Sequence, residues 1–279
     1  MRQFAQQQRV LWHDKIVRAV ERGVHQAVAV RLDEQERRAQ SRHAGLLEAM
    51  QAWERRSRRD LFTAMDLEAA RSSARWLLAE VTSRTFFFIA HDTLRHAVRQ
   101  APADGLVLEF GVATGTTLRI IAEERPDGPV YGFDSFEGLP EHWRFGFAAG
   151  EFSEHGVPDV PGARLVTGWF KDTLPDFLAA HADPVAFVHV DCDLYSSTKT
   201  VLEQLGPRFV VGTVLIFDEF YNHPDWQDHE YRAWQEYVAA SRLTFEYVAV
   251  TVDDEQVAVR ITGLPAAPAG SVSASAPAQ

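Results

Sequence analysis

The sequence predicts an α/β protein with a Rossmann-like, doubly wound sheet of seven strands, an antiparallel last strand and an N-terminal helical extension. From residue 106 onward, short apolar runs alternate with helical patterns, which is the order of a parallel sheet covered on both faces. The last two runs are separated only by residues 253–255. Because a parallel crossover needs about a dozen residues or more, these two strands must form an antiparallel hairpin.

The strands are expected where apolar and β-branched residues cluster between turn signals. They lie near residues 106–111, 130–134, 164–168, 185–191, 212–217, 244–252 and 256–262. In an open sheet of this kind, ligands bind at the carboxyl ends of the parallel strands. The residues that follow these runs are therefore the candidates for a functional site.

The first hundred residues are expected to be helical, because apolar residues recur at three- and four-residue steps and the first proline is Pro102. This pattern places a helical extension at 1–84, for oligomerisation or as a substrate cap, and the sheet domain at 85–263. The Pro-rich end, 264–279, is expected to be disordered. The apolar stripe begins at Val17, Val20, Val24, Val28 and Leu32.

The composition is that of a soluble globular protein. A chain of 279 residues with 46% hydrophobic residues can bury a sizeable core. Its single cysteine, Cys192, excludes an internal disulfide framework and fits a reducing compartment. The sequence contains neither a signal-like apolar start nor a run of about eighteen apolar residues. We therefore expect a cytoplasmic protein that does not insert into membranes.

The net charge of −11 is unevenly distributed. Residues 1–100 contain 18 Lys and Arg against 12 Asp and Glu, whereas residues 101–279 contain 10 against 27. An acidic sheet domain repels phosphates, which argues against nucleic acid as a partner. The basic run at 55–59 is interpreted as a solvated helix face or a contact to an acidic partner, since no recognition motif accompanies it.

A glycine-rich turn follows the first predicted strand, with Glu109, Gly111 and Gly115 in the order E-x-G-x-x-x-G. Dinucleotide binding needs a third glycine, and Thr116 stands where one could fall. Glu109 can accept hydrogen bonds from an ammonium group, whereas it would repel a phosphate. The pattern indicates S-adenosylmethionine, with Thr114 also in the turn. The alternative is an ordinary βα turn that contains two glycines and a glutamate.

Asp134 ends the second predicted strand, 19 residues after Gly115. At this distance an acid in such folds accepts hydrogen bonds from ribose hydroxyls. The alternative is an N-cap of the turn that begins at Ser135. Gly168 and Trp169 follow the third strand, where an aromatic ring can stack on adenine, although Trp169 may equally belong to the core. These residues complete the candidate cofactor site.

Carboxylates follow each of the next two strands, Asp191 and Asp193 after one and Asp218 and Glu219 after the other. Carboxylates gathered at one buried edge raise each other's pKa unless a cation neutralises them. A divalent metal that prefers oxygen ligands, Mg²⁺ or Mn²⁺, is the economical explanation. The alternative is that one acid faces the site while the others cap helices or meet Arg and Lys partners.

Three motifs in this order resemble the macrocin and mycinamicin O-methyltransferase family of the class I S-adenosylmethionine-dependent methyltransferases. They are DSFEGLP from Asp134, HVDCDLYSST from His189 and DEF from Asp218. The resemblance covers roughly residues 85–262. It implies methyl transfer from S-adenosylmethionine to sugar hydroxyls on macrolide antibiotics.

The resemblance also implies a Mg²⁺ site, because family members resemble catechol O-methyltransferase in binding the ion at the ends of the fourth and fifth strands. Carried over to this chain, the metal ligands are Asp191, Asp218 and Glu219. Two positions depart from the catechol enzyme. Leu194 occupies the place of its catalytic lysine, and Glu219 occupies the place of its amide ligand.

Methyl transfer requires an acceptor oxygen in line with the methyl carbon and a group that takes its proton. The candidate bases are Asp191 and Asp193 beside the metal, and His223 or His229 in the loop that follows the metal acids. Asp191 is also assigned to the cofactor site. Two aromatic residues of the same loop are expected to stack against the acceptor, Tyr221 and Trp226.

The expected function is therefore metal-dependent O-methyl transfer to a small molecule, a sugar or another part of a natural product, by a homo-oligomer assembled through the N-terminal helices. The acceptor pocket is expected from residues 1–85 and 140–162, with Trp143, Phe145 and Phe147 as lid or packing residues. Two alternatives remain. One is an NAD-linked oxidoreductase, which the missing third glycine opposes, and the other is a non-catalytic cofactor-binding scaffold, which the metal-competent acids oppose.

Overall fold

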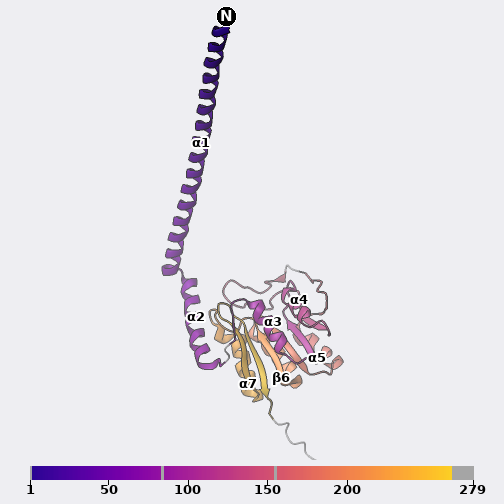
Figure 1. Ribbon diagram of the computed structural model, residues 1–279. Coiled ribbons are helices and arrows are strands. Elements are labelled where there is room, and N and C mark those ends of the chain that lie inside the picture. The colour runs from indigo at the N-terminus through magenta and orange to yellow at the C-terminus, as the bar shows by residue number, and fades with distance from the viewer. Residues whose placement is uncertain (1, 83–84, 154–155, 266–279) are drawn as a thin grey trace, which may run out of the picture. The chain divides into compact units, whose positions relative to one another are not determined.

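The computed structural model describes residues 2–82, 85–153 and 156–265 of the chain (Figure 1). Contacts within the chain define two compact units, Met1–Ala64 and Met65–Gln279. The first unit is helical, and the second contains the sheet. The domain boundaries expected from the sequence remain predictions.

The N-terminal helical extension is present. α1 (Arg2–Arg59) carries ion pairs between residues four apart, such as Arg37 Nη2 with Asp33 Oδ2 at 2.7 Å. After α1, Asp60 Oδ1 accepts a hydrogen bond from Phe62 N at 3.0 Å. This bond satisfies one free amide at the start of α2 (Leu61–Glu80).

Apolar side chains of α1 lie exposed, among them Met50 and Trp53. Oligomerisation through this helix stays a prediction. None of the described helices is long and apolar enough to cross a bilayer. Two expectations fall outside the described residues: the disorder of the C-terminal segment from residue 266, and the start of the apolar stripe, the side chains of Val17, Val20 and Val24.

One sheet of eight strands forms the centre of the second unit, in the order β1-β7-β8-β6-β5-β2-β3-β4. Neighbouring strands are parallel except where β8 pairs with β6 and β7. The predicted doubly wound sheet with an antiparallel last strand is confirmed. The strands are β1 (Phe86–Phe87), β2 (Leu106–Phe110), β3 (Val130–Asp134), β4 (Ala163–Thr167), β5 (Val185–Val190), β6 (Phe209–Phe217), β7 (Thr244–Thr251) and β8 (Val257–Gly263).

The sequence predicted seven of these strands and missed β1. Phe86 and Phe87 pair with Val250 and Thr251 at the sheet edge. Two residues are too few to produce a period-2 pattern, so no alternation marks this strand.

Helices cover both faces of the sheet, as the alternating pattern predicts. α3 and α4 lie beside each other on one face (Figure 1), and α2, α5, α6 and α7 contribute to the core on the other face. The bounds are α3 (Ala90–Gln100), α4 (Thr116–Glu124), α5 (Phe170–Ala180), α6 (Tyr195–Leu205) and α7 (Glu230–Ser241), with short 3₁₀ turns η2 (Gly206–Arg208) and η3 (Trp226–Asp228).

The central strands are buried on both faces. Because successive side chains of a strand point to opposite faces, Leu108 and Phe110 enter one core while Val107 enters the other. Two ionisable residues interrupt this apolar arrangement at full burial, Glu109 on β2 and His189 on β5. Both lie near the carboxyl edge of the sheet, where the candidate site is found.

Candidate active site

A cavity of about 680 Å³ opens at the carboxyl edge of the sheet. It adjoins the ends of β2, β3 and β5, which lie next to one another in the sheet. Its lining joins the glycine turn, the acids and an aromatic wall: Gly111, Ala113, Asp134, Ser135, Phe136, Gly138, Leu139, Pro140, Trp143, Arg144, Phe147, Phe152, Trp169, Phe170, Lys171, Asp191, Cys192, Asp193, Ser196, Ser197, Thr200 and Glu219.

The glycine turn after β2 has a backbone that only glycine accommodates at one position. Gly111 has φ +92°, and a Cβ added there would lie 1.6 Å from the carbonyl oxygen of Asp191. Gly115 has φ +75° and precedes α4. The first glycine therefore permits close contact between two strand ends, and the second permits the entry into the helix.

Asp134 fastens this turn. Its Oδ2 accepts hydrogen bonds from Val112 N at 2.8 Å and Ala113 N at 2.9 Å, and its Oδ1 accepts one from Phe136 N at 2.8 Å. The carboxylate thus caps its own turn and also holds the glycine turn at the cavity wall. The two readings of Asp134 do not exclude each other, since Oδ1 accepts a single hydrogen bond and has a further lone pair for a ribose hydroxyl.

We expect the Asp134→Asn variant to bind S-adenosylmethionine about tenfold or more weakly and to melt at a lower temperature. The asparagine side chain offers only one acceptor oxygen, which is uncharged. The backbone N–H groups that now bond to the two carboxylate oxygens would therefore lose hydrogen bonds of about 1.5–3 kcal/mol each. Calorimetric titration and thermal melting measure the two effects. The exposed Asp127→Asn variant removes the same charge elsewhere, and an equal loss in both variants would contradict this role.

The remaining cofactor candidates divide into two groups. Ser135 and Trp169 line the cavity. The hydroxyls of Thr114 and Thr116 lie 3.0 Å apart on the exposed start of α4, outside the lining. Gly168 has φ +136° and only shapes the turn before Trp169.

Glu109 also lies outside the lining, at full burial. Its Oε1 accepts a hydrogen bond from His189 Nδ1 at 2.8 Å. Burial raises the pKa of Glu109, and the hydrogen bond to His189 opposes this rise. This carboxylate is thus bound by a histidine of the neighbouring strand.

The acids after β5 and β6 converge as predicted, in two overlapping groups. Ligand atoms of Asp191, Asp193 and Glu219 lie within 4.8 Å of one another, and so do those of His189, Asp191 and Asp218. Asp191 is common to both groups. The predicted metal ligands Asp218 and Glu219 therefore each lie close to Asp191, and Asp193 is an additional acid of the group that contains Glu219.

The electrostatics of this cluster fit a divalent cation. Burial raises the pKa of Asp191 and Glu219 well above the ordinary values, and neighbouring carboxylates raise both further. Burial raises the pKa of Asp193 to about 7, against the opposing effect of Arg144. Within the described structure, Glu219 Oε2 is buried without a hydrogen-bond partner. An oxygen-binding cation would satisfy this atom and neutralise the repulsion.

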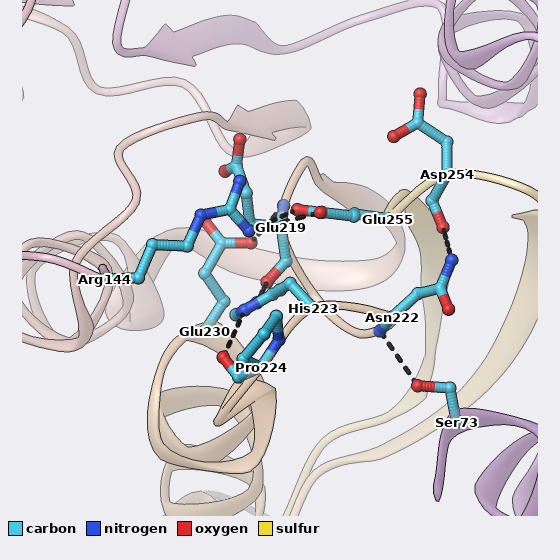
Figure 2. A network of polar contacts seen from close by, with 9 residues as sticks. All are labelled: Ser73, Arg144, Glu219, Asn222, His223, Pro224, Glu230, Asp254 and Glu255. Carbon is cyan, nitrogen blue, oxygen red and sulfur yellow. Dashed lines mark hydrogen bonds and ion pairs between the residues drawn. The ribbon is translucent and has the colours of Figure 1, made fainter. Parts of the chain in front are cut away.

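The segment that follows β6 is fastened from several sides (Figure 2). Asn222 N donates to Ser73 Oγ of α2 at 2.9 Å, and Asn222 Nδ2 donates to the carbonyl oxygen of Asp254 at 3.1 Å. The buried Glu230 accepts a hydrogen bond from Glu219 N at 3.0 Å. These contacts hold the backbone that carries the metal acids.

His223, a candidate base, is buried within this segment (Figure 2). Its Nδ1 lies 2.9 Å from the carbonyl oxygen of Pro224, and its Nε2 lies 3.2 Å from that of Glu219. Burial, together with the smaller effect of Arg144, lowers its pKa to about 4. A neutral ring has a single N–H, so only one of these contacts is a hydrogen bond. His223 is not among the residues that line the cavity.

Arg144 is a positively charged residue of the cavity lining that was not predicted from the sequence. Its Nη1 forms an ion pair with Glu255 at 3.0 Å (Figure 2). Its guanidinium lies 4.0 Å from the ring centroid of Trp143. Glu255 belongs to the turn between β7 and β8. The pair therefore ties the aromatic wall of the cavity to the far hairpin of the sheet.

We expect Arg144→Met and Glu255→Gln to show a coupling of about 0.5–3 kcal/mol in a double-mutant cycle of unfolding, because both side chains are largely buried. Urea denaturation measures it. The matched cycle uses Arg232 and Glu236, an ion pair on the exposed face of α7. Its coupling is expected to be below about 0.5 kcal/mol. Equal coupling in the two cycles would contradict the role of Arg144.

The aromatic prediction for the loop after β6 is wrong. Tyr221 and Trp226 pack against Trp76 of α2, with ring centroids 5.2 Å and 5.9 Å apart, and both are buried in the core. The aromatic wall is instead supplied by residues such as Trp143 and Phe147, within the expected segment 140–162. Residues 65–82 contribute nothing to the lining.

The strand order, with the glycine turn and the acids at one sheet edge, is that of a Rossmann-like α/β fold. Residues 148–260 match the model of the macrocin O-methyltransferase (TylF) family, which confirms the resemblance drawn from the sequence. The matched residues include β4 to β6, the acids that follow β5 and β6, and Glu255.

Named relatives extend this match. The chain is 32% identical over 158 residues to 8-demethyl-8-(2,3-dimethoxy-alpha-L-rhamnosyl)-tetracenomycin-C 4'-O-methyltransferase of Streptomyces olivaceus, covering 46% of this chain and 59% of that protein. It is 30% identical over 174 residues to mycinamicin III 3''-O-methyltransferase of Micromonospora griseorubida, covering 50% and 66%. The chain thus spans about three fifths of the length of these relatives. Among solved structures, the calicheamicin methyltransferase CalS11 matches with 25% identity and a TM-score of 0.48, covering 72% of this chain and 84% of that one.

Proposed function

We propose that this protein is a metal-dependent O-methyltransferase that moves the methyl group of S-adenosylmethionine to a hydroxyl of a natural product. One observation carries the proposal. A single cavity is lined both by the fastened glycine turn with Asp134 and by the acids Asp191, Asp193 and Glu219. A cofactor site and an acidic metal site that share one cavity are what metal-dependent methyl transfer to a hydroxyl requires. The relatives, which are named as O-methyltransferases, support the reaction class.

The chain's own residues that line the cavity divide the work between two groups. The turn held by Asp134 and the ring of Trp169 bind and orient the cofactor. Asp191 and Glu219, with Asp218 beside them, hold a divalent cation, Mg²⁺ or Mn²⁺. When bound, the cation supplies positive charge that favours the deprotonated form of a nearby hydroxyl.

Asp193 is the residue we assign to take the proton of the acceptor. It lines the cavity and groups with Asp191 and Glu219, so its carboxylate lies where the acceptor oxygen must approach the metal acids. It has φ +62°, a left-handed conformation that aspartate tolerates better than most residues. His223 is the second candidate, and its position outside the lining favours Asp193.

The acceptor is proposed to be a sugar or another hydroxyl-bearing part of a natural product. The apolar part of the lining is aromatic and aliphatic, with Leu139, Trp143, Phe147 and Phe152. Such a surface suits the apolar face of a sugar ring or of an aglycone. The names of the relatives, which mention rhamnosyl-tetracenomycin and mycinamicin, are consistent with this class.

Calorimetric titration of S-adenosylmethionine, with Mg²⁺ and again with a chelator, tests the proposal, followed by methyl transfer to a panel of glycosylated acceptors. We expect micromolar binding in both conditions and transfer only with metal. Transfer that continues in chelator would remove the metal from the mechanism. Binding of NAD in place of S-adenosylmethionine would favour an oxidoreductase, and cofactor binding with no transfer to any acceptor would favour a scaffold.

A further inference from the structure

A row of three polar side chains crosses the sheet beneath the metal acids. Glu109 Oε1 accepts a hydrogen bond from His189 Nδ1 at 2.8 Å, and His189 Nε2 lies 3.4 Å from Asp218 Oδ1. Glu109 and His189 are completely buried, and Asp218 is partly exposed. The row therefore leads from the interior of the sheet to an acid at its edge.

The sheet brings these residues together through its register. β2, β5 and β6 are adjacent, Glu109 lies opposite His189, and His189 lies opposite Ile216. Asp218 follows Ile216 by two residues. Side chains two apart on a strand share a face, so all three polar groups lie on the same side of the sheet.

A purely structural role does not account for this row. Other residues on this face of the central strands are apolar, such as Val107 and Phe187, which enter one core. Burying a carboxyl and an imidazole among them costs free energy that an apolar pair would not cost. The chemistry of the row is also specific, because a histidine held through both nitrogens has its ring orientation fixed.

We propose that Glu109 and His189 are positioning residues for the metal site. Glu109 fixes the ring of His189, and His189 fixes Oδ1 of Asp218, so that the other oxygen of Asp218 is presented to the cation. Hydrogen bonds behind a metal ligand commonly change metal affinity by about 10–100-fold when removed. The proposal rests on the proposed function, since it requires a divalent cation at these acids.

His189 has two alternative roles at these acids, that of a positioning residue and that of a metal ligand. His189 also groups with Asp191 and Asp218 within 4.8 Å, so it is itself a possible metal ligand. A positioning role places Asp218 between His189 and the cation. A ligand role places the imidazole nitrogen on the cation, which pulsed electron paramagnetic resonance of bound Mn²⁺ detects as strong nitrogen coupling.

The test is Mn²⁺ titration of the full chain, read by the loss of the free-ion paramagnetic resonance signal, before any activity is measured. We expect Glu109→Gln to weaken Mn²⁺ binding by about 10-fold or more. The double variant Glu109→Met/His189→Phe, which replaces the whole buried pair with apolar groups and so avoids an unpaired charge, is expected to weaken it by up to about 100-fold. Binding of S-adenosylmethionine should change less than about threefold.

Thr93→Val is the matched control, because it breaks another buried polar pair, Thr93 Oγ1 with Thr251 Oγ1 at 2.6 Å, away from the acids. It should lower the melting temperature without changing Mn²⁺ affinity. Unchanged Mn²⁺ affinity in both Glu109→Gln and the double variant overturns the proposal and leaves the metal site itself in place. Strong nitrogen coupling that disappears in the double variant also overturns it, because His189 would then be a ligand. Failure of the unaltered protein to bind Mn²⁺ overturns the proposal and the metal-dependent function together.

Discussion

Asp191→Asn is expected to abolish Mg²⁺ and Mn²⁺ binding and to lower the rate of methyl transfer by about 10³-fold or more. Asp191 is the one carboxylate common to both groups of ligand atoms, so replacing it with a neutral amide removes one negative charge from both groups. Charge stabilisation by a metal contributes several kcal/mol, and each ~1.4 kcal/mol corresponds to a tenfold change in rate. Methyl transfer and Mn²⁺ titration measure the two effects.

The fold should tolerate this substitution. Burial and the neighbouring Asp218 raise the pKa of Asp191, which means that its charge is unfavourable without a cation. In chelator, the variant should therefore melt at a temperature equal to or above that of the unaltered protein, while the stabilisation by added metal disappears. Asp176→Asn, an exposed acid of α5, controls for the charge change. Unchanged metal binding and unchanged transfer in Asp191→Asn would refute the mechanism.

Gly111→Ala is expected to have the largest effect on stability, about 4 kcal/mol or more, or to prevent folding. The added Cβ would lie 1.6 Å from the carbonyl oxygen of Asp191, a backbone atom that cannot rotate away. The residue also has φ +92°, where a side chain is strained. Since Gly111 N donates to Phe133 O at 2.9 Å, moving this residue also disturbs the neighbouring strand end.

Chemical denaturation of Gly111→Ala beside Gly128→Ala tests this expectation. Gly128 has open space around an added Cβ, so its substitution should change stability by no more than about 1 kcal/mol, in the stabilising direction if its backbone suits alanine. Similar stabilities for the two variants would show that the two strand ends separate easily. They would then not form a rigid wall of the cavity.

The longer strands of the sheet could be predicted from the sequence because the central ones are buried on both faces. Continuous apolar runs such as those of β2 and β5 mark strands without ambiguity once turns bound them. The short linker at 253–255 settled the direction of the last strand. β1 could not be found in this way, since a two-residue edge strand depends on pairing with a distant strand and has no pattern of its own.

The acids of the site were predictable for a related reason, because parallel strands bring their carboxyl ends together. Asp191, Asp193, Asp218 and Glu219 follow strands that are adjacent. Arg144 and Glu255 were not predictable, because they lie 111 residues apart in loops that only the finished fold brings together. The contact of Glu109 with His189 was not predictable either, since the sequence could not reveal that His189 faces it across the sheet.

The hydrogen bond between Ser73 and Asn222 has a consequence for how the protein can be dissected. α2 precedes the sheet in sequence, yet Ser73 and Trp76 support the segment that carries the metal acids. A shortened chain that begins at residue 85, where the sheet starts, would retain every proposed ligand and lose part of their support. The smallest fragment with an intact acidic centre must therefore begin before α2 enters this core, near residue 65.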